Sequence, residues 1–380
     1  MRDLSKYRIE NLETFVAGSS VFVRLTTASG VSGIGESTAF AFPGATVNVI
    51  ESMKSFVIGS NPFDVEKNWL ILYRALGWRG ITLGGAISAI DQAYWDIKSR
   101  IYEAPIWEVL GGQSRKGVRA MRVVAGNSVE EVVKQSLQAQ VDGYTAIKVI
   151  LHMHEHHLMR HAEKIEDMVD RIAAIRDAVG NRMDIGVELH RNMQPGSSLT
   201  LIDELEKFFP LFVEDPVPPD SVLSFGEVSS KSRISMAAGE RNTSIYEFRE
   251  YIEHAGISFA RPDIGIAGGF THVRKICAMA EAHHQGIIPH AVPNGPVATM
   301  AHVHMGISAP NWEVQEYMPL DVWPFNEMVD HVPTPKDGYF YPLDAPGLGI
   351  TLNDAFLQAA SVSVFPISPD LREDGSVALR

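Results

Sequence analysis

Cysteine is almost absent from this chain of 380 residues, which contains only Cys277. A single thiol cannot form an intramolecular disulfide, so a disulfide-stabilised scaffold is excluded and a reducing compartment is favoured. Residues 1–8 lack the apolar core of a secretory signal. No apolar run reaches the ~20 residues that a transmembrane helix needs. We therefore expect a cytoplasmic protein that does not span a membrane.

Basic residues are also in deficit. The chain has 33 Lys and Arg against 46 Asp and Glu, which gives a formal net charge of −13. This balance disfavours nucleic acids and anionic membranes as partners, because both would be repelled. A small anionic substrate would need a local positive site, which a bound metal ion could supply.

The first third of the chain has strands followed by helices. Residues 21–26 and 31–36 have the composition of strands, and residues 28–30 between them suit a hairpin turn. Residues 86–97 carry apolar side chains at helical steps of three and four. Because strands and helices do not alternate here, the pattern favours a separate α+β domain that ends near residues 112–117.

Six polar residues recur through the second half of the chain at steps of 26, 26, 23, 27 and 26 residues: Glu188, Glu214, Glu240, Asp263, His290 and Glu316. Each lies at or near the end of a short apolar run, and a helical pattern follows most of these runs. A repeated strand–helix unit implies a parallel sheet. Polar residues at the carboxyl ends of successive strands are how a β/α barrel builds its active site. Residues 118–124 and 144–150 supply two earlier strands.

The first three of these residues are glutamates on adjacent predicted strands. Three carboxylates at close range need a compensating cation, and all-oxygen ligation favours a hard ion such as Mg²⁺. Each glutamate alone would suit the start of a surface loop, but the repeated spacing favours a metal site at Glu188, Glu214 and Glu240. Without metal, removing one of the three charges should relieve their repulsion.

Asp263 and His290 lie on the next two predicted strands and should be neighbours. A carboxylate that binds an imidazole orients it and raises its basicity. His190 follows Glu188 by two residues and therefore shares its face of an extended strand end. Two histidines around a metal suit an acid and a base. Glu316 could bind a substrate oxygen if its carboxyl group were protonated.

Two further stretches bear on substrate binding. The apolar loop at residues 39–44 is either a packed connector or a lid in which Phe40 and Phe42 shield a substrate. Residues 152–161 contain five histidines, whose spacing prevents all of them from converging on a metal unless a helix forms there. We interpret this insert as a loop or helix start above the barrel mouth. Within it, His152 and His154 are candidate substrate contacts.

Several of these motifs together resemble those of one family, the enolase superfamily, and within it the mandelate racemase subgroup. They are Val-Glu-Leu-His at 187–190, Phe-Val-Glu-Asp-Pro at 212–216, Ala-Gly-Glu-Arg at 238–241, Arg-Pro-Asp at 261–263 and Pro-His at 289–290, with 31–36 and 88–96 resembling its capping domain. The resemblance implies an α/β fold in which a modified TIM barrel, (β/α)₇β, carries an α+β capping domain. The implied divisions are residues 1–115 for the cap, 116–320 for the barrel and 321–380 for a segment that packs back on the cap.

Within the subgroup, the chain looks most similar to acid-sugar dehydratases of the galactonate dehydratase type. This match implies that His290, oriented by Asp263, is the base, that His190 is the acid for the leaving 3-hydroxyl, and that Glu316 steadies the enediolate. Two features depart from the type: Glu188 replaces aspartate, and Arg191-Asn192 replaces Gly-Arg. Lys148-Val-Ile150 has only half of the Lys-x-Lys of the racemases, which disfavours a racemase.

The expected function is therefore Mg²⁺-dependent dehydration of a sugar acid to a 2-keto-3-deoxy acid by a lyase, with one Mg²⁺ per active site. Lys148, Phe42, Arg79 and His152 are the expected substrate contacts. Two alternatives stay open. One is a cycloisomerase, epimerase or racemase on the same scaffold, and the other is a non-catalytic protein that binds sugar acids. The resemblance also implies a homo-oligomer.

Overall fold

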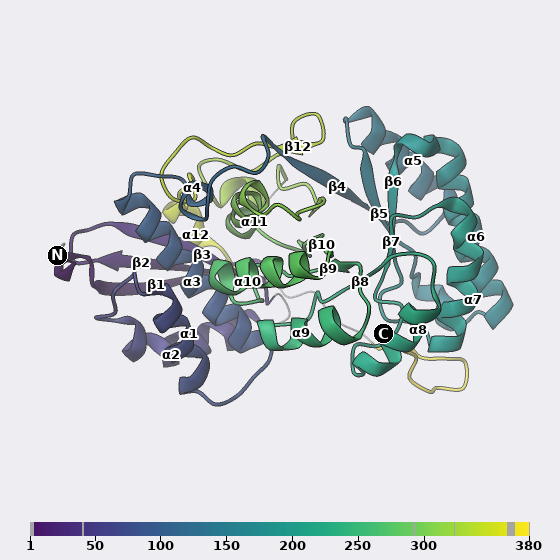
Figure 1. The fold of residues 1–380 in the computed structure, drawn as a ribbon, viewed down its shortest axis with the longest axis horizontal. Coiled ribbons are helices and arrows are strands. Elements are labelled where there is room, and N and C mark those ends of the chain that lie inside the picture. The colour runs from purple at the N-terminus through teal and green to yellow at the C-terminus, as the bar shows by residue number, and fades with distance from the viewer. Residues whose placement is uncertain (1–3, 40–41, 292, 323, 363–368, 380) are drawn as a thin grey trace.

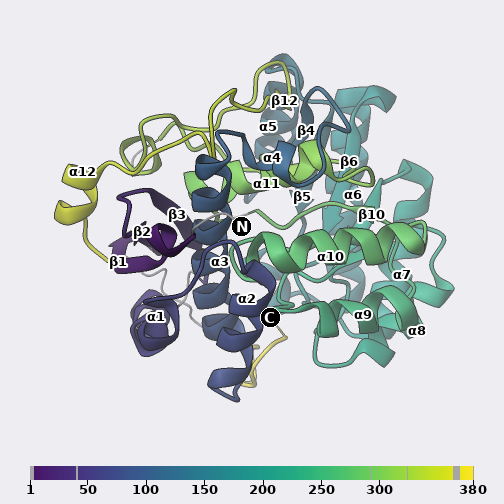
Figure 2. The same ribbon diagram turned by 60° about the vertical axis from the view of Figure 1, so that its left-hand side comes forward.

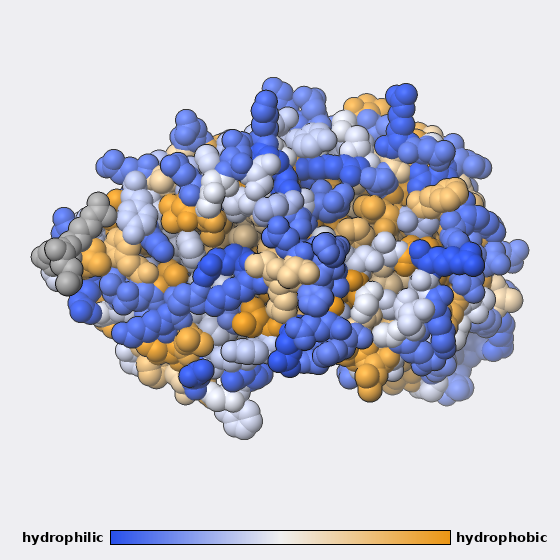
Figure 3. Space-filling view, in the orientation of Figure 1, coloured by the Kyte–Doolittle hydropathy of each residue, from blue (hydrophilic) through white to orange (hydrophobic). Residues whose placement is uncertain are grey.

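The computed structural model describes residues 4–39, 42–291, 293–322, 324–362 and 369–379. Figure 1 shows two parts side by side, the N-terminal strands and helices on one side and the barrel on the other. In the space-filling view, hydrophilic residues predominate and hydrophobic ones are interspersed among them (Figure 3). No helix within the described ranges is both long and apolar enough to cross a membrane.

The N-terminal part is an antiparallel sheet covered by helices. Its sheet has the order β1 (Ile9–Ala17), β2 (Ser20–Thr27) and β3 (Ser32–Ser37), and the helices are α1 (Pro43–Val57), α2 (Val65–Ala75), α3 (Ile81–Ile101) and α4 (Ile106–Val109). Helix α3 packs directly on β3 because Gly33 and Gly35 have no side chains; a Cβ atom at either would overlap the carbonyl oxygens of Ala93 or Ala89. The predicted hairpin is confirmed, whereas β1 is a strand that was not predicted from the sequence.

The next strands along the described chain form a parallel barrel in chain order. They are β4 (Val118–Val124), β5 (Ala146–Ile150), β6 (Asp184–Glu188), β7 (Phe212–Glu214), β8 (Met236–Ala238), β9 (Phe259–Ala260), β10 (Gly286–Ile287) and β11 (Gln315–Tyr317). A bridge from Ile287 to Trp312 and the pairing of β11 with β4 close the ring. Within the described ranges, the helices that connect these strands are α5 (Val129–Val141), α6 (His161–Val179), α7 (Pro195–Leu205), α8 (Val222–Lys231), α9 (Ile245–His254), α10 (Gly269–Ala282) and α11 (Pro296–Ser308). This confirms the predicted (β/α)₇β barrel with a capping domain.

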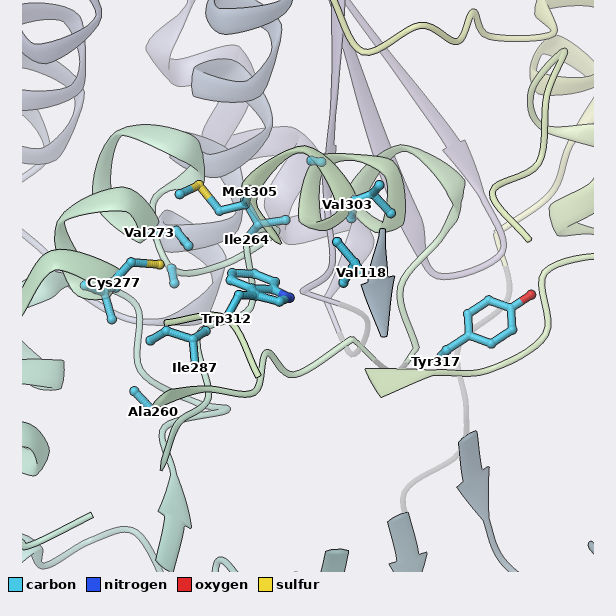
Figure 4. Packing of buried hydrophobic residues seen from close by; sticks show 14 of the residues in the cluster. Val118, Ala260, Ile264, Val273, Cys277, Ile287, Val303, Met305, Trp312 and Tyr317 are labelled. Carbon is cyan, nitrogen blue, oxygen red and sulfur yellow. The ribbon is translucent and has the colours of Figure 1, made fainter. Parts of the chain in front are cut away.

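The barrel interior has an apolar layer below a polar one. The apolar cluster consists of Met121, Ala146, Phe212, Ala237, Ile288 and Val314. Side chains on a strand alternate between faces, so a residue two positions further along points to the same side. Phe212, Ile288 and Val314 therefore stand below Glu214, His290 and Glu316. Outside the sheet, Trp312 packs under α11 near Val118, Val303 and Met305, in the core that also buries Cys277 (Figure 4).

Glu36, at the end of β3, joins the capping domain to the barrel. Its carboxylate accepts hydrogen bonds from the backbone amides of Gly295 (2.8 Å), Val297 (3.1 Å) and Ala298 (2.9 Å) at the start of α11. Ser20 donates a further bond to it at 2.8 Å. Complete burial raises the pKa of Glu36 to about 7 although these bonds favour the anion. A helix N-terminus is a favourable place for a carboxylate, so Glu36 fixes the cap to the barrel.

Gly295→Ala is expected to loosen this joint, because a Cβ atom there would overlap the Glu36 carboxylate. Overpacking of this kind typically costs about 1–3 kcal/mol, so the melting temperature measured by calorimetry should fall. Gly196→Ala is the matched control: its Cβ would meet nothing within 4 Å. Equal melting temperatures for the two variants would contradict the role of Glu36 as an anchor.

The segment after residue 320 packs on both the cap and the barrel. Helix α12 (Asp354–Ala359) contacts β1, and Asp354 pairs with Arg24 of β2, so this stretch packs on the cap. Strand β12 (Tyr339–Phe340) instead pairs with β4 of the barrel. The last described residues also return to the barrel, where Leu379 lines a pocket with Pro195 of α7 and Ser224 of α8. Figures 1 and 2 show the overall course of the chain. The divisions near residues 115 and 320 remain our proposal for the domain boundaries.

Candidate active site

Three carboxylates meet at the carboxyl-terminal edge of the barrel strands. Glu188 ends β6 and pairs in register with Glu214, which ends β7, and Glu240 follows β8 after a tight Gly239 turn. One oxygen of each lies within 4.8 Å of the others. Glu188 and Glu214 are almost fully buried, and the Glu240 side chain is 10% exposed. The sheet register therefore gathers the three residues that the sequence spacing singled out.

Buried cations surround these carboxylates. The Lys148 ammonium on β5 lies 3.0 Å from both Glu188 Oε2 and Glu214 Oε2 and also contacts Glu316. Burial lowers the pKa of Lys148, but the surrounding carboxylates outweigh it and raise the pKa above its usual value. Arg261, fully buried, contacts Glu214 and donates to Glu316 Oε2 at 3.0 Å. Lys148 and Arg261 therefore pair with the buried carboxylates, which would otherwise be costly uncompensated charges.

The triad has the chemistry of a divalent-cation site. It offers only oxygen ligands, which Mg²⁺ prefers at about 2.0–2.1 Å, and protein sites for this ion usually leave positions open for water or substrate. Burial, together with the neighbouring Glu188, raises the pKa of Glu214 although Arg261 and Lys148 oppose the shift. Close carboxylates of this kind favour a bound cation. Glu188, Glu214 and Glu240 therefore fit a metal ion and would be its ligands.

A carboxylate–imidazole dyad stands beside the triad. His290 Nδ1 is 2.9 Å from Asp263 Oδ2, and His290 Nε2 is 3.7 Å from Glu240 Oε2. Asp263 is itself held, since its Oδ1 accepts bonds from Thr38 Oγ1 at 3.0 Å and from the Gly265 amide at 2.7 Å. With Nδ1 donating to Asp263, Nε2 is the nitrogen that faces the triad. Burial lowers the pKa of His290, but Asp263, Glu240 and Glu316 outweigh it and raise it to about 9.

His190 approaches the triad from the β6 side. It has a left-handed backbone with φ of 54°, as does Arg191 with 67°, and such conformations are rare for residues other than glycine. Its amide donates to Glu188 Oε1 at 2.8 Å, and its carbonyl accepts from the Asn192 side chain at 2.7 Å. Backbone strain held by specific bonds is common at functional sites. Burial, helped by the charge of Arg191, lowers the pKa of His190 to about 3.

Glu316 accepts hydrogen bonds and does not donate them. Burial would raise its pKa, but Lys148 and Arg261 outweigh burial and lower it to about 2. Its Oε2 accepts from Arg261 and, at 2.7 Å, from the Ala291 amide next to His290. From the sequence, its contact with a substrate oxygen was expected only if its carboxyl group were protonated. These contacts favour the ionised carboxylate, which holds the loop carrying His290 through the Ala291 amide.

The expected substrate contacts lie in different places. Lys148 lies inside the carboxylate cluster, and His152 follows β5 at the same edge. Phe42 is 52% exposed at the start of α1. Arg79 instead stacks on Tyr73 at 3.8 Å and donates to the Tyr73 and Trp78 carbonyls, so its described contacts lie within the cap and not at the triad. Phe40 and the side chain of His154 lie outside what the structure describes.

Two arginines at the site were not predicted as functional. Arg261 stands two residues before Asp263, and strand periodicity places both on one face, so this spacing was an available signal. Arg191 contacts Glu240 and lies 3.3 Å from Asp215 Oδ2. Nothing in its spacing predicts these bonds, because they depend on the left-handed turn after β6. Thr38 of the cap also reaches Asp263, a contact that only the docking of the two domains creates.

Comparison with known families identifies the chain. Residues 131–356 match the family described as "Enolase C-terminal domain-like". The chain belongs to the enolase superfamily. Residues 10–111 match the N-terminal domain of the mandelate racemase and muconate lactonizing enzymes, which places this enolase-superfamily enzyme in the mandelate racemase subgroup.

Solved structures of other superfamily members share this architecture. A Salmonella enterica protein named as a candidate dehydratase is 29% identical, with 93% of this chain and 98% of that one covered and a TM-score of 0.87. A candidate mandelate racemase/muconate lactonizing enzyme from Labrenzia alexandrii is 28% identical, with 96% and 99% covered and a TM-score of 0.87. A candidate galactarate dehydratase from Agrobacterium radiobacter, bound to Na and L-malate, is 24% identical, with 98% and 100% covered and a TM-score of 0.93, and supports the fold alone.

Proposed function

We propose that this enolase-superfamily enzyme is a Mg²⁺-dependent dehydratase of a sugar acid, an aldonate or aldarate, which it converts to a 2-keto-3-deoxy acid. The observation that carries the proposal is the placement of two histidines around one carboxylate triad. His290 is fixed to Asp263, whereas His190 is held through its backbone by Glu188 and Asn192. Dehydration needs a base for the α-proton and an acid for the leaving hydroxyl, and this pair supplies two different imidazoles.

Each residue of the site has a separate role in the proposed reaction. Glu188, Glu214 and Glu240 would hold Mg²⁺, which when bound would neutralise the charge that develops on the substrate carboxylate. The Lys148 ammonium would contact the same carboxylate. His290 Nε2 would remove the α-proton. His190 would protonate the departing 3-hydroxyl after taking up a proton from solvent in the substrate complex. The charge of Glu240 helps to raise the pKa of His290, so a cation that neutralises Glu240 would bring this pKa back toward neutrality, where a base works best.

One observation favours a second candidate, an epimerase or racemase on the same scaffold. The pKa of His190 is lowered to about 3, so its imidazole is neutral in this environment. A neutral imidazole suits a second base better than a general acid, and isomerisation needs bases on both faces without a leaving group. A non-catalytic binding protein is the less favoured hypothesis, because the residues proposed as the base, its carboxylate partner and the metal ligands lie together.

Proton NMR in D₂O decides between these functions. The enzyme with MgCl₂ is incubated with a panel of aldonic and aldaric acids. A dehydratase produces a 2-keto-3-deoxy acid, whereas an isomerase exchanges the α-proton with inversion and releases no water. If no acid of the panel gives either a 2-keto-3-deoxy product or α-proton exchange, the proposed function fails. A cytoplasmic homo-oligomer remains the proposed state of the enzyme.

The loop before α1 is proposed as a lid. Phe42 is 52% exposed although it is large and apolar, and its amide bonds to the Ala39 carbonyl at 2.9 Å beside the cap–barrel joint. Phe42→Ser should raise KM and lower kcat while the melting temperature changes little, because exposed side chains add little to stability. Leu223→Ser, at a position 84% exposed on α8, is the control and should leave kinetics unchanged. A large fall in melting temperature with unchanged kinetics would show that Phe42 belongs to the core.

A further inference from the structure

The last described residues, 369–379, lie against the barrel mouth. Asp370 is only 5% exposed, and its Oδ2 is 3.7 Å from Nε2 of His152. Glu373 pairs with Arg160 at 3.3 Å, at the start of α6. Arg372 and Leu379 line a pocket of about 140 Å³ together with Lys164 and Asn192. The end of the chain therefore contacts both the histidine-rich insert and the loop that carries His190.

Sheet register places His152 beside His190. Ile150 of β5 pairs with Glu188 of β6, and the Leu151 amide donates to the Glu188 carbonyl at 3.0 Å. His152 and His190 both follow this pair by two residues, at the same edge of the barrel. Burial, helped by the charge of Lys164, lowers the pKa of His152 to about 4. His152 is therefore a neutral imidazole next to the proposed acid.

The insert is anchored by hydrogen bonds, whereas the described contacts of the His152 ring are an edge-on contact with the His156 ring, with centroids 6.0 Å apart, and the facing carboxylate of Asp370. His156 Nδ1 accepts from the Met153 amide at 3.1 Å, and its Nε2 is 2.8 Å from Asp167 Oδ2 on α6. His152 Nδ1, in contrast, is buried with no hydrogen-bond partner among the described residues. Nε2 of His152 faces the carboxylate of Asp370 in the C-terminal segment. The orientation of His152 therefore depends on Asp370.

We propose that residues 369–379 form part of the active site, with Asp370 as a positioning residue that holds His152 beside His190 for contact with the hydroxyl-bearing chain of the substrate. The nature of that substrate rests on the proposed function. A carboxylate facing Nε2 favours the tautomer with the proton on that nitrogen. It leaves Nδ1 as an acceptor, which matches the hydroxyl donors of a sugar acid. The contact lies away from the reacting carbon, so it should affect substrate affinity more than the chemical step.

Kinetics of a small set of variants test the coupling. Asp370→Asn and His152→Gln should each raise KM for a sugar acid about tenfold, the effect of one lost hydrogen bond, with kcat changed less than about twofold. If Asp370 acts through His152, the double variant should be no worse than His152→Gln alone. Asp370→Glu should restore part of the affinity. Asp374→Asn, which alters an exposed carboxylate of the same segment, is the control and should behave as the parent. If the increase in KM of the double variant equals the product of the two single increases, the proposal is overturned.

Hydrogen exchange measured by mass spectrometry gives a readout that needs no turnover. In the full-length protein, Asp370→Asn should speed amide exchange in residues 151–158, and Asp374→Asn should not. Unchanged exchange in the first variant would overturn the positioning role even if the parent dehydrates sugar acids. Faster exchange in a protein that turns over no sugar acid would support the positioning role while the proposed function fails.

Discussion

Glu240→Gln is expected to bind Mg²⁺ far more weakly than the parent and to lose turnover. Glu240 is one of three carboxylates with oxygens within 4.8 Å of one another, and an amide oxygen in its place carries no net charge. Loss of a group that merely supports a metal ligand typically costs about 10–100-fold in affinity, and loss of a ligand should cost more. Isothermal titration with MgCl₂ measures this affinity. Glu253→Gln, at a side chain 36% exposed on α9, is the control and should bind as the parent does.

The same variant should also be less stable without metal. Repulsion within the triad alone predicts the opposite, since one of three like charges is removed. The structure reverses this expectation because Glu240 contacts Arg191, whose side chain is only 4% exposed. Burial would raise the pKa of Glu240, but Arg191 outweighs burial and lowers it. The neutral amide of the variant would leave Arg191 with Asp215 as its remaining acidic partner, so calorimetry in EDTA should show a lower melting temperature. A variant that binds Mg²⁺ as tightly as the parent would contradict the triad.

The polar layer of the barrel could be predicted from sequence because parallel strands align their carboxyl ends. The spacing of Glu188, Glu214 and Glu240 reflects one strand, one helix and two loops per unit, and their register in the sheet follows from that repeat. The dyad of Asp263 and His290 was predictable for the same reason. Fold class followed from the same alternation of strands and helices.

Contacts that depend on loops and on domain docking could not be predicted. Strand β1 is fully buried only at Ile9, Leu12 and Ala17, so its apolar alternation is weak. The lowered pKa of Glu316 depends on Lys148 of β5 and on Arg261, which directly follows β9. Asp370 reaches His152 across more than two hundred residues of chain, and no local pattern marks such a contact. Sequence periodicity reports which face of an element is buried, not which distant side chain meets it.

The two histidines should differ in what their loss abolishes. His290→Asn is expected to stop both α-proton exchange and product formation, because His290 Nε2 faces the triad and Asp263 binds its other nitrogen. His190→Asn should stop product formation but leave measurable exchange, since the α-proton can still be removed. Loss of a general acid or base typically costs about 10²–10⁴-fold in rate. The measurement is proton NMR in D₂O with MgCl₂ and a sugar acid that the parent turns over.

The electrostatic surroundings of His290 and His190 make that experiment decisive between the two assignments of base and acid. The pKa of His290 is raised to about 9 and that of His190 is lowered to about 3, so His290 is protonated and His190 is neutral at pH 7. Taken alone, these states would make His190 the base and His290 the acid. The assignment of His290 as the base depends on Mg²⁺ offsetting the charge of Glu240. His284→Asn, a histidine that follows α10, is the control and should leave both rates unchanged. If His190→Asn loses exchange while His290→Asn keeps it, the two roles are reversed and the dyad of His290 and Asp263 delivers the proton to the departing hydroxyl.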